Sequence, residues 1–182
     1  FPWNQEKVDM FKRLWQGWDE AGVSLMLRPN FTLDGHGFPL PYYSEFLDCF
    51  AFAAERGLIA VDFDSLTGMF AANGLTLYAI ASSLNLNRGR TAEAVTADFL
   101  LAFGAAAPVM REYYALLRQA MENNVTAYEN SRNIEGGNWA NFFIHAHRIY
   151  TPEVMLQADG LLQQARAAAA DDDSRARLDF VA

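Results

Sequence analysis

Residues 22–74 read GVSLMLRPNFTLDGHGFPLPYYSEFLDCFAFAAERGLIAVDFDSLTGMFAANG, and this stretch decides the fold. It holds two short apolar runs, at 23–28 and 58–63, with an amphipathic helical segment at about 42–56 between them. A strand, a helix and a second strand in this order predict a βαβ unit, whose two strands are parallel neighbours. The carboxyl ends of such strands meet at one face, where parallel α/β folds bind ligands. The residues expected there are Arg28, Asn30, Asp62 and Asp64.

The rest of the chain is predicted to be helical. Apolar residues recur at helical spacing over 4–21, and a helix is expected at 75–84 after a loop that reads TGMFAANG. From Thr91 onward we expect only helices. Thr151-Pro152-Glu153 is a helix start, with an N-cap, a proline at the first helical position and an acid at the positive end of the dipole. The fold class is therefore α/β, with βα units first and a helical bundle second, predominantly helical overall.

Composition excludes several classes of function. The chain has 182 residues, is 52% hydrophobic and carries a formal net charge of −8, so it has a real core but not the basic face that nucleic acids need. No apolar run approaches the length of a bilayer span, and no signal peptide is visible. The one cysteine, Cys49, excludes an internal disulfide framework and is expected to be a small buried hydrophobe. The cellular compartment stays open.

Asp62 and Asp64 are the candidate catalytic residues. Spaced by two on a strand, they point to the same side, while Val61 and Phe63 would face the helices. Two carboxylates at a strand end could act as nucleophile, base or acceptor of sugar hydroxyls. The alternative is structural: Asp64 would form an Asx-turn and Asp62 would pair with an arginine.

Arg28, Asn30 and His36 are candidate substrate contacts. Arg28 could bind a carboxylate or hold Asp62 in position, and a purely structural Arg28–Asp62 ion pair is the alternative. Asn30 could bond a sugar hydroxyl. His36, between two glycines of a long loop, could carry a proton or contact a sugar.

Tyr42 and Phe70 lie outside the helical stripes and could stack on sugar rings. No cofactor is expected, because nucleophile elbows, phosphate loops and dinucleotide fingerprints are absent from the sequence. No metal is expected either: on a helix His145 and His147 would point about 200° apart and could not chelate one ion.

Three segments carry a resemblance to a known family. They are LRPNFTLDGHGFP (27–39), GLIAVDFDSLTGMFAANGLTLYAIASSLN (57–85) and DFLLAFGAAAPVMREYYALL (98–117), with similar terminal helices at 150–165 and 174–180. The chain resembles the carboxyl-terminal half of a bacterial glycoside-hydrolase-like domain, once catalogued as a domain of unknown function. That family includes endo-β-N-acetylglucosaminidases acting on complex N-glycans and α-glucuronidase-like relatives.

The resemblance implies a (β/α)8 barrel followed by helices. Residues 1–90 would then be a partial barrel segment that contains late strands, and 91–182 would be a helical extension packed on it. The general acid would lie on an earlier strand outside this chain. The chain begins without methionine, and its last residues read as the start of a new helix; we therefore expect a piece of a longer protein, whose remainder completes the barrel. A secreted or periplasmic parent is one option.

The expected function is a segment of a glycoside hydrolase that supplies glycan contacts and one catalytic carboxylate. Asp64 is preferred because it lies nearer the end of its strand. Two alternatives remain open. One is a non-catalytic carbohydrate-binding or scaffold module, and the other is a helical interaction domain whose bundle, 91–169, binds a protein partner.

Overall fold

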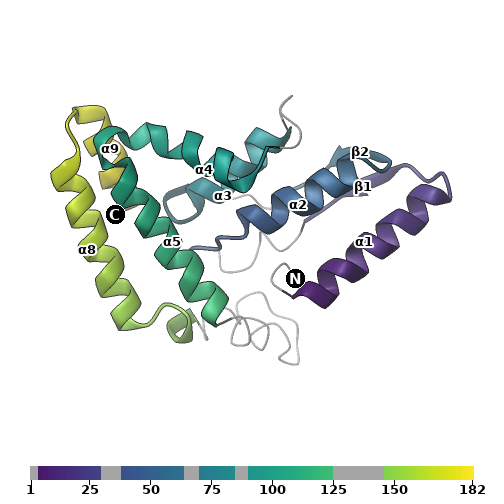
Figure 1. The fold of residues 1–182 in the computed structure, drawn as a ribbon, viewed down its shortest axis with the longest axis horizontal. Helices are drawn as coiled ribbons and strands as arrows, with labels where there is room; N and C mark the ends of the chain where they lie inside the picture. Colours follow the sequence, from purple (N-terminus) through teal and green to yellow (C-terminus); the bar gives the residue numbers. More distant parts are fainter. Residues whose placement is uncertain (1–3, 30–37, 64–69, 85–89, 125–145) are drawn as a thin grey trace.

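The computed structural model describes residues 4–29, 38–63, 70–84, 90–124 and 146–182. Most of these residues are helical, and one small parallel sheet accompanies the helices, as the sequence predicted (Figure 1). The elements are α1 (Gln5–Glu20), β1 (Leu25–Leu27), α2 (Tyr43–Ala54), β2 (Leu58–Val61), α3 (Phe70–Leu84), α4 (Ala92–Leu100), the 3-10 helix η2 (Leu101–Ala106), α5 (Ala107–Asn123), the 3-10 turn η3 (Ala146–Arg148), α8 (Pro152–Ala168) and α9 (Asp172–Val181). We call α1 through β2 the sheet half and α3 through α9 the helical half.

Strands β1 and β2 pair in parallel, which confirms the βαβ prediction. Leu27 lies opposite Val61, and the backbone N–H of Asp62 donates to the carbonyl of Leu27 at 2.9 Å. Both strands are shorter than the sequence runs suggested. The backbone of Val23 instead bonds back to the end of α1, and Pro29 has no N–H with which to extend the ladder.

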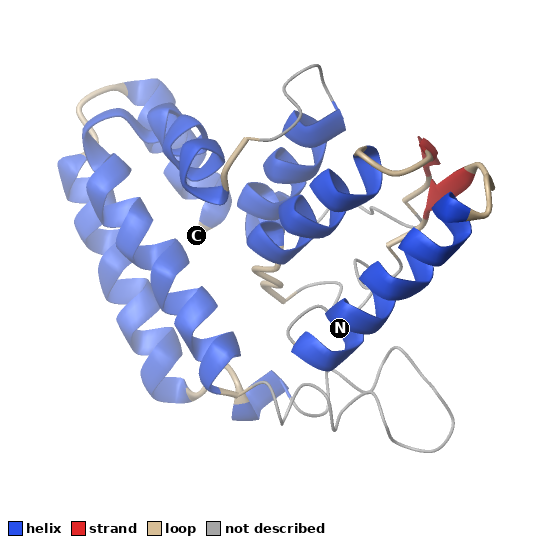
Figure 2. Cartoon of the chain, turned by 45° about the vertical axis from the view of Figure 1, so that its right-hand side comes forward, coloured by secondary structure: helices blue, strands red, loops and turns tan. Residues whose placement is uncertain are grey.

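In the part of the chain that the structure describes, helices cover one face of this sheet. Leu27 is buried, and Val61 packs against the same core beneath α2. On the other side Met26 is 57% exposed, and its partner across the ladder, Ala60, is exposed as well. Figure 2 shows the two strands at one end of the molecule, beside α1. Among the residues that the structure describes the sheet has two strands, so the larger barrel stays a prediction.

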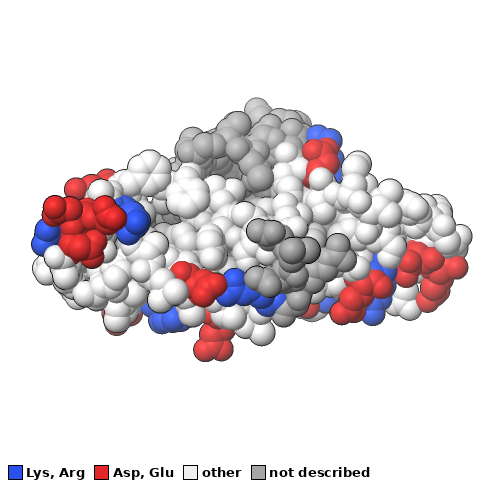
Figure 3. Space-filling view, turned by 90° about the horizontal axis from the view of Figure 1, so that it is seen from above, with Lys and Arg blue, Asp and Glu red and all other residues white. Residues whose placement is uncertain are grey.

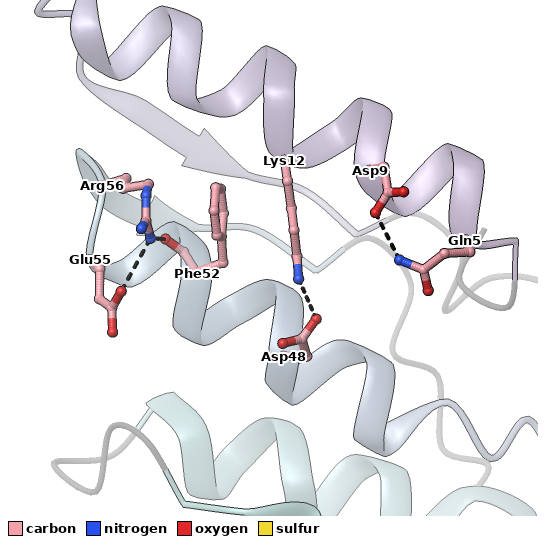
Figure 4. Close-up of polar contacts among 7 residues, drawn as sticks. All are labelled: Gln5, Asp9, Lys12, Asp48, Phe52, Glu55 and Arg56. Carbon is pink, nitrogen blue, oxygen red and sulfur yellow. Dashed lines mark hydrogen bonds and ion pairs between the residues drawn. The ribbon is translucent and has the colours of Figure 1, made fainter.

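Helix α1 docks on α2 through a mixed polar and aromatic contact (Figure 4). The Nζ atom of Lys12 lies 2.5 Å from Oδ2 of Asp48. The Phe52 ring makes two cation–π contacts: Nζ of Lys12 lies 5.5 Å from the ring centroid, and Cζ of Arg56 lies 4.0 Å from it. Buried Trp15 donates its indole N–H to the carbonyl of Arg56 at 2.6 Å. These contacts anchor α1 beside the sheet.

The helical half is built around α5 and α8, which lie side by side (Figures 1 and 2). Met110 and Met121 of α5, Ile149 before α8 and Leu178 of α9 are completely buried. The predicted start of α8 is confirmed: the Thr151 hydroxyl accepts from the N–H of Val154, and Pro152 is the first helical residue. The acid-rich start of α9 contributes to the acidic cluster at one end of the molecule in Figure 3.

The run Ala92–Asn123 is long and apolar enough to cross a membrane by length and composition, a feature not expected from the sequence. The core helix of a soluble protein passes the same test. Here Met110, Leu117 and Met121 are buried in the hydrophobic core. The run also bends at Gly104, whose φ of 52° and ψ of −126° interrupt η2. Its buried side chains and its bend fit a core position.

The two halves are joined by polar contacts around the segment before α2. Arg118 of α5 binds both carboxylate oxygens of Glu45, at 2.6 and 3.1 Å, and donates to the carbonyl of Pro41 at 3.0 Å. The hydroxyl of Tyr150 donates to the carbonyl of Pro39 at 2.5 Å. A single hydrophobic cluster also runs from Trp15 through both halves.

Candidate functional site

Arg28 and Asp62 lie together at the carboxyl ends of the two strands. Each is the residue that directly follows its strand, and the backbone bond from Asp62 to Leu27 keeps the two chain segments in register. Nη1 of Arg28 lies 2.5 Å from Oδ2 of Asp62. Their side chains are 45% and 42% exposed. Of the four residues expected at this face, Arg28 and Asp62 do lie together, as the ion pair that the sequence left as an alternative.

The pair occupies the uncovered face of the sheet. Side chains alternate along an extended chain, and Val61 at the end of β2 and Phe63 beyond it both pack against the core, as expected. The ring centroid of Phe63 lies 5.7 Å from that of Phe46 on α2. Asp62, between these two residues, therefore points away from the helices, and Arg28 reaches it on that side.

This arrangement offers a donor and an acceptor side by side. A carboxylate accepts hydrogen bonds at both oxygens, and a guanidinium donates in a fixed planar fork. Neighbouring sugar hydroxyls each donate and accept, so they match such a pair. Arg28 fixes the orientation of the Asp62 carboxylate through Oδ2.

The other predicted site residues do not join this pair in the described structure. Asp64, Asn30 and His36 lie outside the described residues. Tyr42 is only 3% exposed; its backbone bonds to Leu40 and Phe46 at the start of α2, and its ring lies in the core rather than on the described surface. The predictions for the first three stay predictions.

Phe70 is exposed, as a ligand contact must be, but it does not sit in a loop. It is the first residue of α3 and is 46% exposed. Its ring centroid lies 6.3 Å from that of Phe180 on α9. The expected loop over the strand end is therefore wrong from Phe70 onward, because these residues already belong to the helix.

A polar groove between α2, α4 and α5 was not predicted from the sequence. Its volume is about 420 Å³, and it is lined among others by Tyr43, Glu93, Arg111 and Arg118. The sequence does not indicate this groove, because its lining residues come from three separate helices. Arg118 already binds Glu45 and Glu122, so the best-placed cation of the groove serves the fold.

The described residues contain no cluster of three or more histidine, cysteine, aspartate or glutamate side chains that could hold a metal ion. Cys49 is buried, as predicted, and burial raises the pKa of its thiol to about 12. A thiol with this pKa is protonated at neutral pH and makes a poor nucleophile.

The sequence matches no family model, and comparison with curated proteins and with solved structures finds no similar chain. Function must therefore be argued from the geometry of the strand ends and of the helical half.

Proposed function

We propose that this chain is part of a carbohydrate-active enzyme of glycoside-hydrolase type, and that Arg28 and Asp62 contact the glycan. One observation carries the proposal: helices cover one face of the parallel strand pair, and the half-exposed Arg28–Asp62 pair lies at the strand ends on the other. In (β/α)8 enzymes the active site is built at the carboxyl ends of the strands. The uncovered face would be the interior side of such a barrel.

In this proposal Asp62 accepts a sugar hydroxyl and Arg28 both orients Asp62 and donates to the substrate. Asp64, two residues further along, is the proposed catalytic carboxylate. Glycosidases need a second carboxyl group that protonates the leaving oxygen. We propose that the remainder of the parent protein supplies it, together with the other strands.

The test uses the full-length parent and the separate substitutions Asp62→Asn and Asp64→Asn. The substrates are a panel of glycans that includes complex N-glycans, and the readout is the release of sugar. Asp64→Asn should lower kcat by about 10²-fold or more, as expected for a catalytic carboxylate. Asp62→Asn should lower kcat/KM by about tenfold or more, because a hydrogen bond to a charged group is lost.

Asp179→Asn is the matched control. Oδ1 of Asp179 lies 3.0 Å from Nε of Arg166, and this pair is also exposed. Exposed ion pairs contribute about 0–1 kcal/mol to stability, so Asp62→Asn and Asp179→Asn should both fold. Undiminished hydrolysis by both strand-end variants, or no glycan bound or cleaved by the parent, contradicts the proposal. Glycan binding without turnover in the parent identifies the non-catalytic module instead.

A further inference from the structure

A second hollow lies in the helical half, between α3, α4, η2 and α9. Its volume is about 580 Å³. Neither Arg28 nor Asp62 lines it, so it is separate from the pair at the strand ends. Pockets for small molecules commonly have volumes of about 300–1,000 Å³ and are lined mainly by apolar and aromatic side chains.

The walls of this cavity are aromatic rings. They come from elements far apart in the sequence: Phe70, Tyr78, Phe99, Phe103 and Phe180. Phe99 is buried in the wall, with ring centroids 5.6 Å from Tyr78 and 5.7 Å from Phe103. Rings at such distances prefer tilted or edge-on contacts, and a further flat ring can join them in the same way.

Two of the rings remain exposed to water. Phe70 is 46% exposed and Phe180 is 58% exposed, although the two rings contact each other at a centroid distance of 6.3 Å. Apolar area left in water costs roughly 25 cal/mol per Å² relative to burial. A ligand that covers both rings therefore binds with a favourable free energy, because it removes their exposed apolar area from water.

The charged groups around the cavity are already paired with one another. Asp98 binds Arg90, and Arg177 lies 3.9 Å from Asp173 and donates to the carbonyl of Ala102 at 2.8 Å. Two carboxylates and one guanidinium line the cavity, and Arg90, which pairs with Asp98 from outside the lining, brings the net charge of this group to zero. An anion or a cation would lose its hydration without an unmatched opposite charge to compensate, so the rim favours a neutral ligand.

We propose that this cavity is a binding site for an uncharged aromatic small molecule. Its ring system would pack against Phe99 and Phe103 and be covered by Phe70 and Phe180. The aromatic walls set the preference for a flat apolar ring, and the balanced rim sets the preference against charge. This site is independent of the glycan site and does not rest on the function proposed for Arg28 and Asp62.

The test is a fluorescence titration of the chain with N-phenyl-1-naphthylamine, a neutral aromatic probe. Its anionic relative 8-anilinonaphthalene-1-sulfonate has the same ring framework and is the control for charge. The neutral probe should bind with one-to-one stoichiometry and at least about tenfold more tightly than the sulfonate. Equal or tighter binding of the sulfonate overturns the preference for an uncharged ligand.

Two substitutions locate the site. Ala176 lines the cavity and is exposed, so Ala176→Trp should fill the hollow from the solvent side without disturbing the core, and should abolish binding. Phe180→Ala should weaken binding about tenfold. Met155→Ala, which changes a residue of α8 that is 52% exposed and does not line the cavity, is the control and should bind unchanged.

Binding that survives Ala176→Trp places the probe elsewhere and overturns the proposal. Dimerisation of the chain that Phe180→Ala removes would also overturn it, because the exposed rings would then be a contact between two copies. Arg28→Met should leave probe binding unchanged, because Arg28 does not line the cavity. A chain that binds the probe while its parent cleaves no glycan would overturn only the glycan proposal.

Discussion

The sheet half and the helical half differ in how completely they enclose their apolar side chains. In the helical half the central side chains, such as Met110 and Met121, are fully enclosed. In the sheet half the described helices cover one face, and Met26 remains 57% exposed on the other. Leu14 and Trp18 of α1 are exposed as well, at 58% each. The sheet half therefore keeps an apolar face available for contacts.

Alkaline pH should produce the largest effect. Burial raises the pKa of Tyr150, Tyr114 and Tyr113 in the helical half, and raises the pKa of Cys49 in the sheet half to about 12. Above pH 9 the unfolded chain loses these protons first, because its thiol and phenols titrate near pH 9 to 10. The folded state then binds more protons than the unfolded state, so stability falls as pH rises.

Each of these groups lowers the free energy of unfolding by about 1.4 kcal/mol per pH unit above its unfolded pKa. We expect cooperative unfolding between about pH 10 and 12, followed by circular dichroism. Cys49→Ala removes the group that begins to lower the free energy of unfolding at the lowest pH. Relative to its stability at neutral pH, the variant should therefore unfold with a midpoint at higher pH. A helical signal unchanged up to pH 12 would contradict the prediction.

The second prediction makes one chemical change in both halves. Met110→Ala should destabilise the chain by about 2–5 kcal/mol, because it leaves a cavity in a fully enclosed core. Met26→Ala should cost less than about 0.5 kcal/mol, since this side chain is mostly in water. Urea unfolding measures both. Equal costs would mean that the bare face of the sheet is covered in solution.

The third prediction compares two arginines that each pair with a carboxylate. Arg118→Met should cost about 1–3 kcal/mol, because Glu45, whose side chain is only 20% exposed, loses both of its hydrogen bonds from the guanidinium. Arg28→Met breaks the exposed pair with Asp62 and should cost about 0–1 kcal/mol. A larger cost for Arg28→Met would make the strand-end pair a structural contact rather than a functional one.

The fourth prediction concerns glycines and has the smallest expected effect. Gly104 has a φ of 52°, and an added Cβ would lie 3.0 Å from Oγ of Ser174, so Gly104→Ala should cost about 1–2 kcal/mol. Gly17 lies within α1 with open space around it, and Gly17→Ala should stabilise the chain by about 0.5–1 kcal/mol. Thermal unfolding of both variants gives the sign of each change.

Local chemistry made much of the fold predictable from the sequence. Apolar periodicity located the strands and helices, and the hydroxyls of Thr91 and Thr151 marked helix starts because they accept backbone N–H groups within their own first turns. Cys49 was placed correctly on the buried side of α2. The Arg28–Asp62 pair was also within reach of the sequence, because parallel pairing brings both strand ends together.

Contacts between distant segments were not predictable in this way. Asn73 looked like a loop residue, yet its side chain accepts from the N–H of Leu40 at 2.7 Å and donates to the carbonyl of Phe38 at 3.1 Å. These bonds hold a local kink inside α3 and let the helix begin at Phe70. The aromatic cavity could not be predicted for the same reason: Phe70 and Phe180 come into contact only when α3 and α9 pack together.

The hydrogen bond from Tyr150 to Pro39 joins residues separated by 111 positions. Closing so long a loop has a large entropic cost, so this contact should be absent from the transition state of folding and form afterwards. Tyr150→Phe would then accelerate unfolding and leave the folding rate nearly unchanged. The hydrogen bond of the Tyr150 phenol would thus slow the separation of the two halves, and it would not speed their docking.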